Sequence, residues 1–228
     1  LKAVFTARGL PGEKLYPLGI PVSRSFSQKE DRQAVCKRLG LDPDIRYVLA
    51  AGGSMGGGKV KKIIQTLADE IAGRKDTKLI VICGSNKRMY DELVRKALPG
   101  VKVIGFTSDM AEYMKAADLF VTKPGGLSST EAAVCGIPMI HVAPIPGCET
   151  YNARFFSGCG MSRFCHTSKR ELAEALKILD SKTECDTMVR NQRKIIRPDS
   201  AGRISDFAEK MAAAAASVTV NVLRSVSI

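Results

Sequence analysis

The stretch "DLFVTKPGGLSSTEAAVCGIPMIHVA", residues 118–143, contains two apolar runs separated by a segment with helical spacing. The first run, 118–123, leads into Pro-Gly-Gly, after which hydroxyl and acidic side chains open the helical segment. That segment ends at Gly136, and the second run covers 137–143. A strand, a helix and a second strand in this order form one crossover between parallel strands. The stretch therefore predicts a βαβ unit with a glycine-rich corner.

The same order recurs along the chain. The predicted strands are 46–52, 78–84, 101–106, 118–123, 137–143 and, with a weaker pattern, 158–165. The predicted helices between them are 59–73, 87–97, 109–117, 127–135 and 150–157. Successive strands start roughly 20 to 30 residues apart, which suits βαβ crossovers. We therefore predict an α/β fold with a doubly wound, Rossmann-like parallel sheet covered by helices on both faces.

The two ends of the chain differ from this pattern. We predict that 26–215 is the main domain and that it closes with helices over 168–180, 183–196 and 199–215. Residues 1–25 are predicted to be the remnant of a preceding domain and an interdomain linker, with a helix end at 1–9 and a strand within 14–21. Residues 216–228 are predicted to be a low-complexity or disordered tail. We expect the chain to be part of a longer protein.

The chain has a net charge of +12, which limits the classes of partner. Nucleic acid, an anionic membrane surface, and a solvated face around an anionic small ligand are the three candidates. Basic residues are spread along the chain, aromatic residues make up only 6% and tryptophan is absent, all of which argue against nucleic acid. No apolar run approaches the roughly 20 residues that a membrane-spanning helix needs.

Seven cysteines and two histidines bear on metal and redox chemistry. The cysteines form no CxxC pair, so we predict reduced thiols and no metal site. The "DPD" at 42–44 precedes the first strand, and we interpret it as turn chemistry rather than a metal-binding motif. His141 lies in an apolar strand, where a buried, hydrogen-bonded imidazole is the expected state.

Ligands of doubly wound sheets bind at the carboxyl ends of the strands. The segments predicted to lie there are "GGSMGGGK" (52–59), "CGSNK" (83–87), "GFTSD" (105–109), "KPGGLSSTE" (123–131) and "PIPGCE" (144–149). Glycine permits close approach of the backbone, and amides at a helix N-terminus favour an anion. The corners at 53–59 and 125–128 therefore predict a diphosphate held between them. Two simpler explanations stay open, a flexible glycine-rich connection at 52–59 and a capping box formed by Ser128 and Glu131.

Three segments carry a resemblance to a known family: "AAGGSMGGGKV" (50–60), "VICGSNKRMYDEL" (81–93) and 101–156, which includes "TKPGGLSSTEA" and "PGCETYN". They resemble the C-terminal half of GT-B glycosyltransferases, in particular the diacylglycerol glycosyltransferases, which include monogalactosyldiacylglycerol synthase and processive diacylglycerol β-glucosyltransferase. The lipid-linked GlcNAc transferases of peptidoglycan synthesis are more distant relatives. Neither the dinucleotide motif GxGxxG nor the P-loop motif is present, which argues against a nicotinamide dehydrogenase.

The resemblance implies an inverting transfer of a hexose from a UDP-sugar to a diacylglycerol-type lipid, with no cofactor besides the donor. It also implies a cytoplasmic enzyme attached peripherally to an anionic membrane surface. In the family the general base and the acceptor site belong to the N-terminal domain, so no catalytic residue is assigned here. The alternatives are a UDP-GlcNAc-using transferase with another lipid-linked acceptor, a UDP-sugar epimerase and a non-catalytic nucleotide-binding module.

The resemblance also implies individual site residues. Uracil would lie beside Phe106 and Thr107, and the ribose hydroxyls would meet Glu131. The nucleotide-binding set is Gly53, Ser54, Gly84, Phe106, Thr107, Gly125, Gly126, Ser128, Ser129 and Glu131. The sugar-binding set is Cys148, Glu149 and Asn152. Relatives carry glutamine where this chain has Cys148, which leaves the identity of the sugar open. Lys123 is either a neutralising charge beside the diphosphate or a solvated surface lysine.

Overall fold

The computed structural model describes the backbone of residues 2–51, 58–166 and 168–226, and the side chains of these residues apart from 58, 59 and 215–226. The chain divides into two compact units. One consists of Leu1–Val22 with Arg197–Ile228, and the other of Ser23–Ile196. Each unit is described by itself below.

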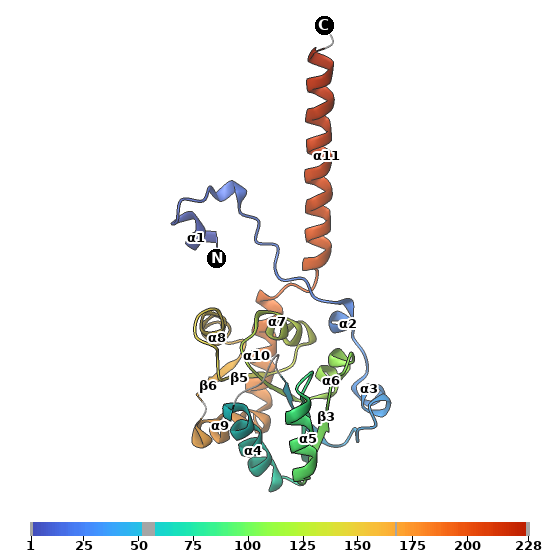
Figure 1. The fold of residues 1–228 in the computed structure, drawn as a ribbon, viewed down its shortest axis with the longest axis vertical. Helices are drawn as coiled ribbons and strands as arrows, with labels where there is room; N and C mark the ends of the chain where they lie inside the picture. Colours follow the sequence, from blue (N-terminus) through green and yellow to red (C-terminus); the bar gives the residue numbers. More distant parts are fainter. Residues whose placement is uncertain (1, 52–57, 167, 227–228) are drawn as a thin grey trace. The chain divides into compact units, whose positions relative to one another are not determined.

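The unit Ser23–Ile196 is built on a six-stranded sheet in the order β3-β2-β1-β4-β5-β6 (Figure 1). The strands are β1 Arg46–Ala51, β2 Thr77–Ile82, β3 Val101–Ile104, β4 Leu119–Thr122, β5 Met139–Val142 and β6 Arg163–Cys165. Every neighbouring pair is parallel. The order reverses between β1 and β4, which is the position where doubly wound sheets bind ligands. The predicted fold class is confirmed.

Helices cover both faces of the sheet (Figure 1). They are α2 Arg24–Ser27, α3 Arg32–Arg38, α4 Gly58–Ala72, α5 Lys87–Lys96, α6 Met110–Ala116, α7 Gly126–Cys135, α8 Cys148–Gly158, α9 Lys169–Leu176, η2 Lys177–Asp180 and α10 Lys182–Ile195. Successive strand residues point to opposite faces, so Val48 packs with α4, α5 and α9, whereas Leu49 packs with α3, α6, α7 and α8. Because both faces are covered, the strands are apolar runs rather than alternating patterns.

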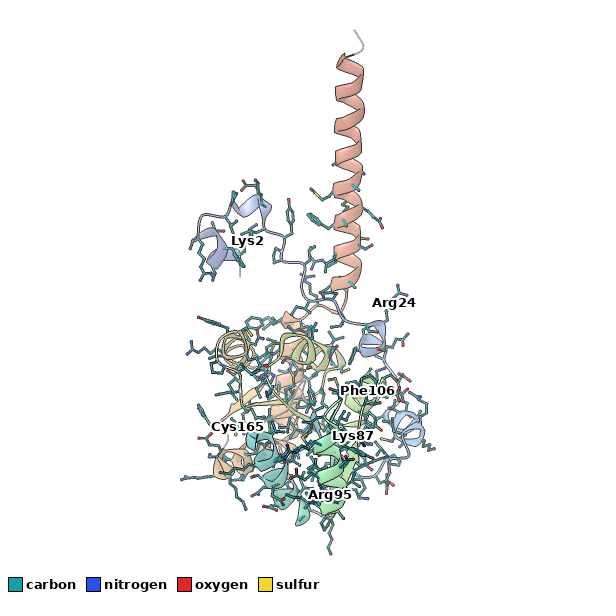
Figure 2. All side chains as sticks on the ribbon, viewed as in Figure 1. Lys2, Arg24, Lys87, Arg95, Phe106 and Cys165 are labelled. Atoms are coloured by element: carbon teal, nitrogen blue, oxygen red, sulfur yellow. The ribbon has the colours of Figure 1, made fainter. Side chains whose placement is uncertain are left out.

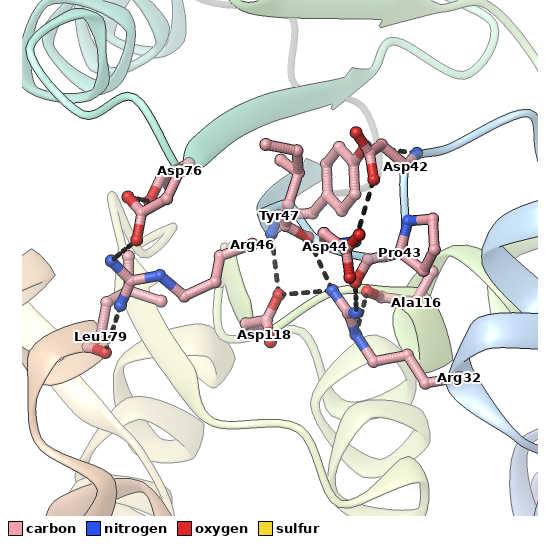
Figure 3. Close-up of polar contacts among 12 residues, drawn as sticks. Arg32, Asp42, Pro43, Asp44, Arg46, Tyr47, Asp76, Ala116, Asp118 and Leu179 are labelled. Atoms are coloured by element: carbon pink, nitrogen blue, oxygen red, sulfur yellow. Dashed lines mark hydrogen bonds and ion pairs between the residues drawn. The ribbon is translucent and has the colours of Figure 1, made fainter.

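At the amino ends of the strands, Arg32 joins α3 to the sheet (Figure 3). Its guanidinium donates hydrogen bonds to the carbonyl oxygens of Pro43, Ile45 and Ala116. It also pairs with the Asp118 carboxylate at 3.1 Å, and the same carboxylate oxygen accepts from the Tyr47 N–H at 2.8 Å. The cluster thereby fixes α3 to the starts of β1 and β4.

The "DPD" segment forms the predicted turn beside this cluster (Figure 3). The Asp44 N–H donates to Asp42 Oδ1 at 2.9 Å, and the Asp42 N–H donates to the Tyr47 hydroxyl at 2.9 Å. Both aspartates therefore serve the turn, at the opposite end of the strands from the glycine-rich corners.

The other unit contains α1 Lys2–Thr6, η1 Gly12–Lys14 and α11 Ser200–Val226. The predicted strand within 14–21 is wrong, because residues 15–23 form no strand. Pro17 and Pro21 lack the N–H that a strand ladder needs, and Gly19 adopts a φ of +96°. Helix α11 continues beyond the helix predicted over 199–215. No helix within the described residues is both long and apolar enough to cross a membrane.

Candidate functional site

The strands of the parallel sheet end at one edge, and the segments that follow them carry most of the predicted site residues. Gly84 follows β2, Phe106 and Thr107 follow β3, and the 123–131 segment follows β4. Cys148 and Glu149 follow β5 and open α8. Gly53 and Ser54 lie outside the described residues. The fold therefore brings the described site residues to the carboxyl edge of the sheet, as predicted from the chain order.

Helix α7 begins at this edge without a side-chain cap. Its N-cap is Gly125, and no side chain accepts a hydrogen bond from its first turn, so the capping box of Ser128 and Glu131 does not form. The Gly125 N–H donates to the Lys123 carbonyl at 2.8 Å. The N–H groups of Gly126, Leu127 and Ser128 have no partner among the described residues. Three unpaired amides at the positive end of a ten-residue helix form a place for an anion.

Glu131 lies one and a half turns into α7 and is half-buried. Burial raises the pKa of its carboxyl above the usual range. Among the described residues, no side chain or backbone group forms a hydrogen bond or an ion pair with this carboxylate. A partly desolvated carboxylate without a partner is costly, and such groups concentrate where a ligand supplies the missing hydrogen bonds.

Ser129 points into the protein from the first turn of α7. It is fully buried, and its Oγ lies 3.0 Å from His141 Nε2. Ser162 Oγ lies 3.0 Å from Nδ1 of the same imidazole. The predicted buried and hydrogen-bonded state of His141 is confirmed, and burial lowers the pKa of this imidazole to about 4. The contact of Ser129 with a diphosphate stays a prediction, since its hydroxyl already has a partner inside the protein.

The segments after β2 and β3 carry the residues predicted to meet uracil. The Gly84 N–H donates to the Gly105 carbonyl at 3.1 Å, and Gly84 has a φ of +57°, which favours glycine. Phe106 is 81% exposed (Figure 2), although large apolar side chains are usually covered. Thr107 Oγ1 accepts from the Asp109 N–H at 3.0 Å and fixes the turn. An exposed aromatic ring on a tied loop provides an apolar surface at the carboxyl edge of the sheet, and its contact with uracil stays a prediction.

Helix α8 brings the predicted sugar residues next to α7. Asn152 Nδ2 donates to the Pro124 carbonyl at 3.0 Å, which joins α8 to the segment leading into α7. Glu149 Oε2 accepts from the Ile145 N–H at 2.6 Å and holds the segment after β5. Cys148 is exposed at the start of α8. Asn152 therefore contacts the segment before the glycine corner, and the sugar-binding roles of Cys148, Glu149 and Asn152 stay predictions.

Two polar residues next to His141 were not predicted from the sequence. Ser162 lies in a weak strand pattern that gives no hint of its bond to His141. Thr122 pairs in register with His141 across β4 and β5, and its buried hydroxyl has no hydrogen-bond partner among the described residues. The pairing of Thr122 with His141 on adjacent strands could have indicated a polar site here. That pairing follows only once the order of the strands is known.

Comparisons with known proteins identify the family and the fold. The model of the glycosyltransferase family 28 C-terminal domain matches residues 47–217. Processive diacylglycerol beta-glucosyltransferase of Staphylococcus saprophyticus is 33% identical over 191 residues, which cover 82% of this chain and 48% of the relative. The chain thus spans about half the length of the curated relatives it matches.

Solved structures show the same fold. A putative UDP-N-acetylglucosamine 2-epimerase from Listeria monocytogenes superposes with a TM-score of 0.71 at 20% identity, covering 91% of this chain and 57% of that one. Anabaena Alr3699/HepE, solved in complex with UDP-glucose, gives a TM-score of 0.62 at 19% identity, covering 93% and 61%. On the match over residues 47–217, the chain belongs to the family of glycosyltransferase family 28 C-terminal domains.

Proposed function

We propose that this chain is the donor-binding half of an inverting glycosyltransferase that moves a hexose from a UDP-sugar to a diacylglycerol-type lipid. One observation carries the proposal: the unpaired amides of the α7 N-terminus and the unpartnered carboxylate of Glu131 lie on one helix at the carboxyl edge of the sheet. An anion acceptor and a hydroxyl acceptor on one helix suit a diphosphate joined to a ribose.

The site residues then take the following parts. The amides of 126–128 hold the diphosphate, and the Glu131 carboxylate accepts the ribose hydroxyls. Phe106 and Thr107 border the uracil, and the residues of α8 meet the sugar. The acceptor hydroxyl attacks the anomeric carbon as the bond to UDP breaks, and the charge that develops on UDP is stabilised by the positive end of α7. Lys123 has no ion-pair partner among the described residues and adds positive charge at this corner.

The relatives support the substrate classes. The Staphylococcus relative is named for glucosyl transfer to diacylglycerol, and the Anabaena protein was solved with UDP-glucose. An epimerase acting on a UDP-sugar is the second candidate, because an epimerase superposes with the higher TM-score of the two structures. The higher sequence identity of the transferase favours transfer. Release of UDP together with a glycolipid separates transfer from sugar isomerisation.

A membrane-bound acceptor requires that the whole protein reach a bilayer. We propose that it works in the cytoplasm as a peripheral protein, attracted to anionic lipid by its positive charge. The net charge of +12 supports this proposal, because each basic residue near an anionic surface contributes about 1 kcal/mol.

Calorimetry on this chain tests the donor site. UDP should bind, whereas ATP and NAD should not bind with comparable affinity. Glu131→Ala should weaken UDP binding by roughly 1–3 kcal/mol, the scale of a lost charged hydrogen bond, and should barely change binding of uracil. Glu174→Ala is the matched control, because Glu174 pairs with Lys177 on the exposed side of α9. ATP binding as tightly as UDP would overturn the uracil assignment.

A further inference from the structure

A hydrogen-bonded chain of three buried side chains lies behind the candidate diphosphate corner. Ser129 on α7 and Ser162 beside β6 each lie 3.0 Å from a different nitrogen of the His141 imidazole on β5. Ser129 and His141 are fully buried and Ser162 is 5% exposed. The Phe156 ring meets the imidazole edge-on, with centroids 5.4 Å apart and an angle of 87° between the planes. The imidazole is therefore fixed both by hydrogen bonds and by packing.

The two serines have opposite hydrogen-bonding roles toward His141, one as donor and the other as acceptor. A neutral imidazole has one nitrogen that donates a hydrogen bond and one that accepts. One serine oxygen therefore accepts from the ring N–H, and the hydroxyl of the other donates to the bare nitrogen. Either assignment leaves both ring nitrogens satisfied, which matches the neutral state that burial imposes on His141.

The bond from His141 reaches the part of α7 that carries the unpaired amides. Ser129 directly follows Ser128, the last of the three residues with free N–H groups. Two other side-chain bonds hold this region: Thr130 Oγ1 donates to the Gly126 carbonyl at 2.7 Å within α7, and Asn152 of α8 donates to the Pro124 carbonyl before it. Among the residues that the structure describes, the Ser129–His141 contact is the side-chain hydrogen bond that joins the first turn of α7 to a strand of the sheet.

We propose that His141 is a positioning residue that acts through Ser129, holding the first turn of α7 so that the amides of Gly126, Leu127 and Ser128 point at a bound nucleoside diphosphate. This inference rests on the function proposed above. His141 does not touch the ligand. Preorganised backbone donors bind an anion well only when a second layer of contacts fixes their direction, because small errors of placement weaken each hydrogen bond.

The test compares two variants, each of which loses one hydrogen bond to the same imidazole. Ser129→Ala and Ser162→Ala each remove one buried serine–histidine bond of 3.0 Å, but only Ser129 lies on α7. We expect Ser129→Ala to weaken UDP binding by calorimetry roughly five- to tenfold, and Ser162→Ala by at most about twofold, at similar losses of thermal stability. Hydrogen exchange of the amides at 129–131 should accelerate in Ser129→Ala and stay near the unaltered rate in Ser162→Ala.

A conservative change separates positioning from packing. His141→Gln keeps an amide that can bond to Ser129, and we expect UDP affinity within about threefold of the unaltered chain, whereas His141→Leu should fall at least as far as Ser129→Ala. Equal effects of Ser129→Ala and Ser162→Ala on both UDP affinity and hydrogen exchange would overturn the inference. Absence of UDP binding by the unaltered chain would instead overturn the proposed function, and the positioning role with it.

Discussion

The buried imidazole of His141 should make the stability of the fold depend on pH. Burial lowers its pKa from 6.5 to about 4, so the unfolded chain takes up a proton at a higher pH than the folded chain does. The contribution of the neutral imidazole to stability is therefore complete above about pH 6.5 and is lost as the pH falls toward the folded pKa. With 1.36 kcal/mol for each pKa unit, the total loss is on the order of 3 kcal/mol.

Urea unfolding at several pH values between about 7.5 and 5 measures this loss. The free energy of unfolding should fall by about 2 kcal/mol between pH 6.5 and 5. His141→Gln should remove most of this slope. The raised pKa of Glu131 acts in the opposite direction, because stability from a raised pKa is lost as the pH rises, but Glu131 is present in both proteins. The difference between the two slopes therefore isolates the imidazole.

Proton NMR gives the same answer without a substitution. The chain has only two histidines, and His166 is exposed, so two sets of imidazole signals are expected. The His141 signals should stay constant from about pH 8 down to about 5, well below the ordinary histidine range. A midpoint for His141 at or above 6.5 would refute the reasoning, since a protonated ring could not accept a hydrogen bond from either serine.

The remaining predictions concern the amino edge of the sheet, the sugar end and the membrane. Arg32→Lys should lower the free energy of unfolding by about 2–3 kcal/mol in urea, since an ammonium cannot reach Asp118 and three carbonyls together, while Arg24→Lys should change little; equal stabilities would contradict this. Cys148 should be the fastest of the seven thiols to react with a thiol reagent, and a bound UDP-hexose should slow it; labelling indifferent to the donor would remove Cys148 from the sugar site. The full-length protein should sediment with anionic vesicles at low salt and dissociate at about 0.5 M, where the Debye length is roughly 4 Å; no association at any salt would leave the charge as a solvated surface.

The sheet could be predicted because each strand is a short apolar run between segments with helical spacing. The run at 46–52 became β1 Arg46–Ala51, and the run at 137–143 became the shorter β5. Such runs are distinctive because helices bury both faces of a parallel sheet. The prediction of a strand within 14–21 was wrong because its two prolines lack the N–H groups that strand pairing needs, although its other residues are mostly apolar.

The site could be predicted only in part. Chain order placed the loops at one edge, whereas the roles of Glu131 and Phe106 come from the resemblance and stay predictions. The partners of buried polar groups could not be predicted, because the contact between Ser129 and His141 depends on how α7 packs on β5. Nor could the sequence decide between a capping box and a free carboxylate at Glu131, since the same spacing suits both.

The N-caps of the helices help to distinguish an anion site at the start of α7 from a purely structural corner. Five helices of this unit begin with a side chain that accepts a backbone hydrogen bond, from Ser23, Asp31, Asn86, Ser168 and Ser181. Three α-helices with a described N-cap have no side-chain cap: α6 at Asp109, and α7 and α8 at Gly125 and Gly147, the two that begin at glycine. A serine or aspartate at such a position stabilises a helix by typically about 1 kcal/mol relative to alanine, and glycine lacks the side-chain acceptor. These two helices carry the residues predicted to meet the diphosphate and the sugar. A cap at Gly125 would occupy the amides that we propose for the donor, so the missing cap suits an anion site better than a purely structural corner.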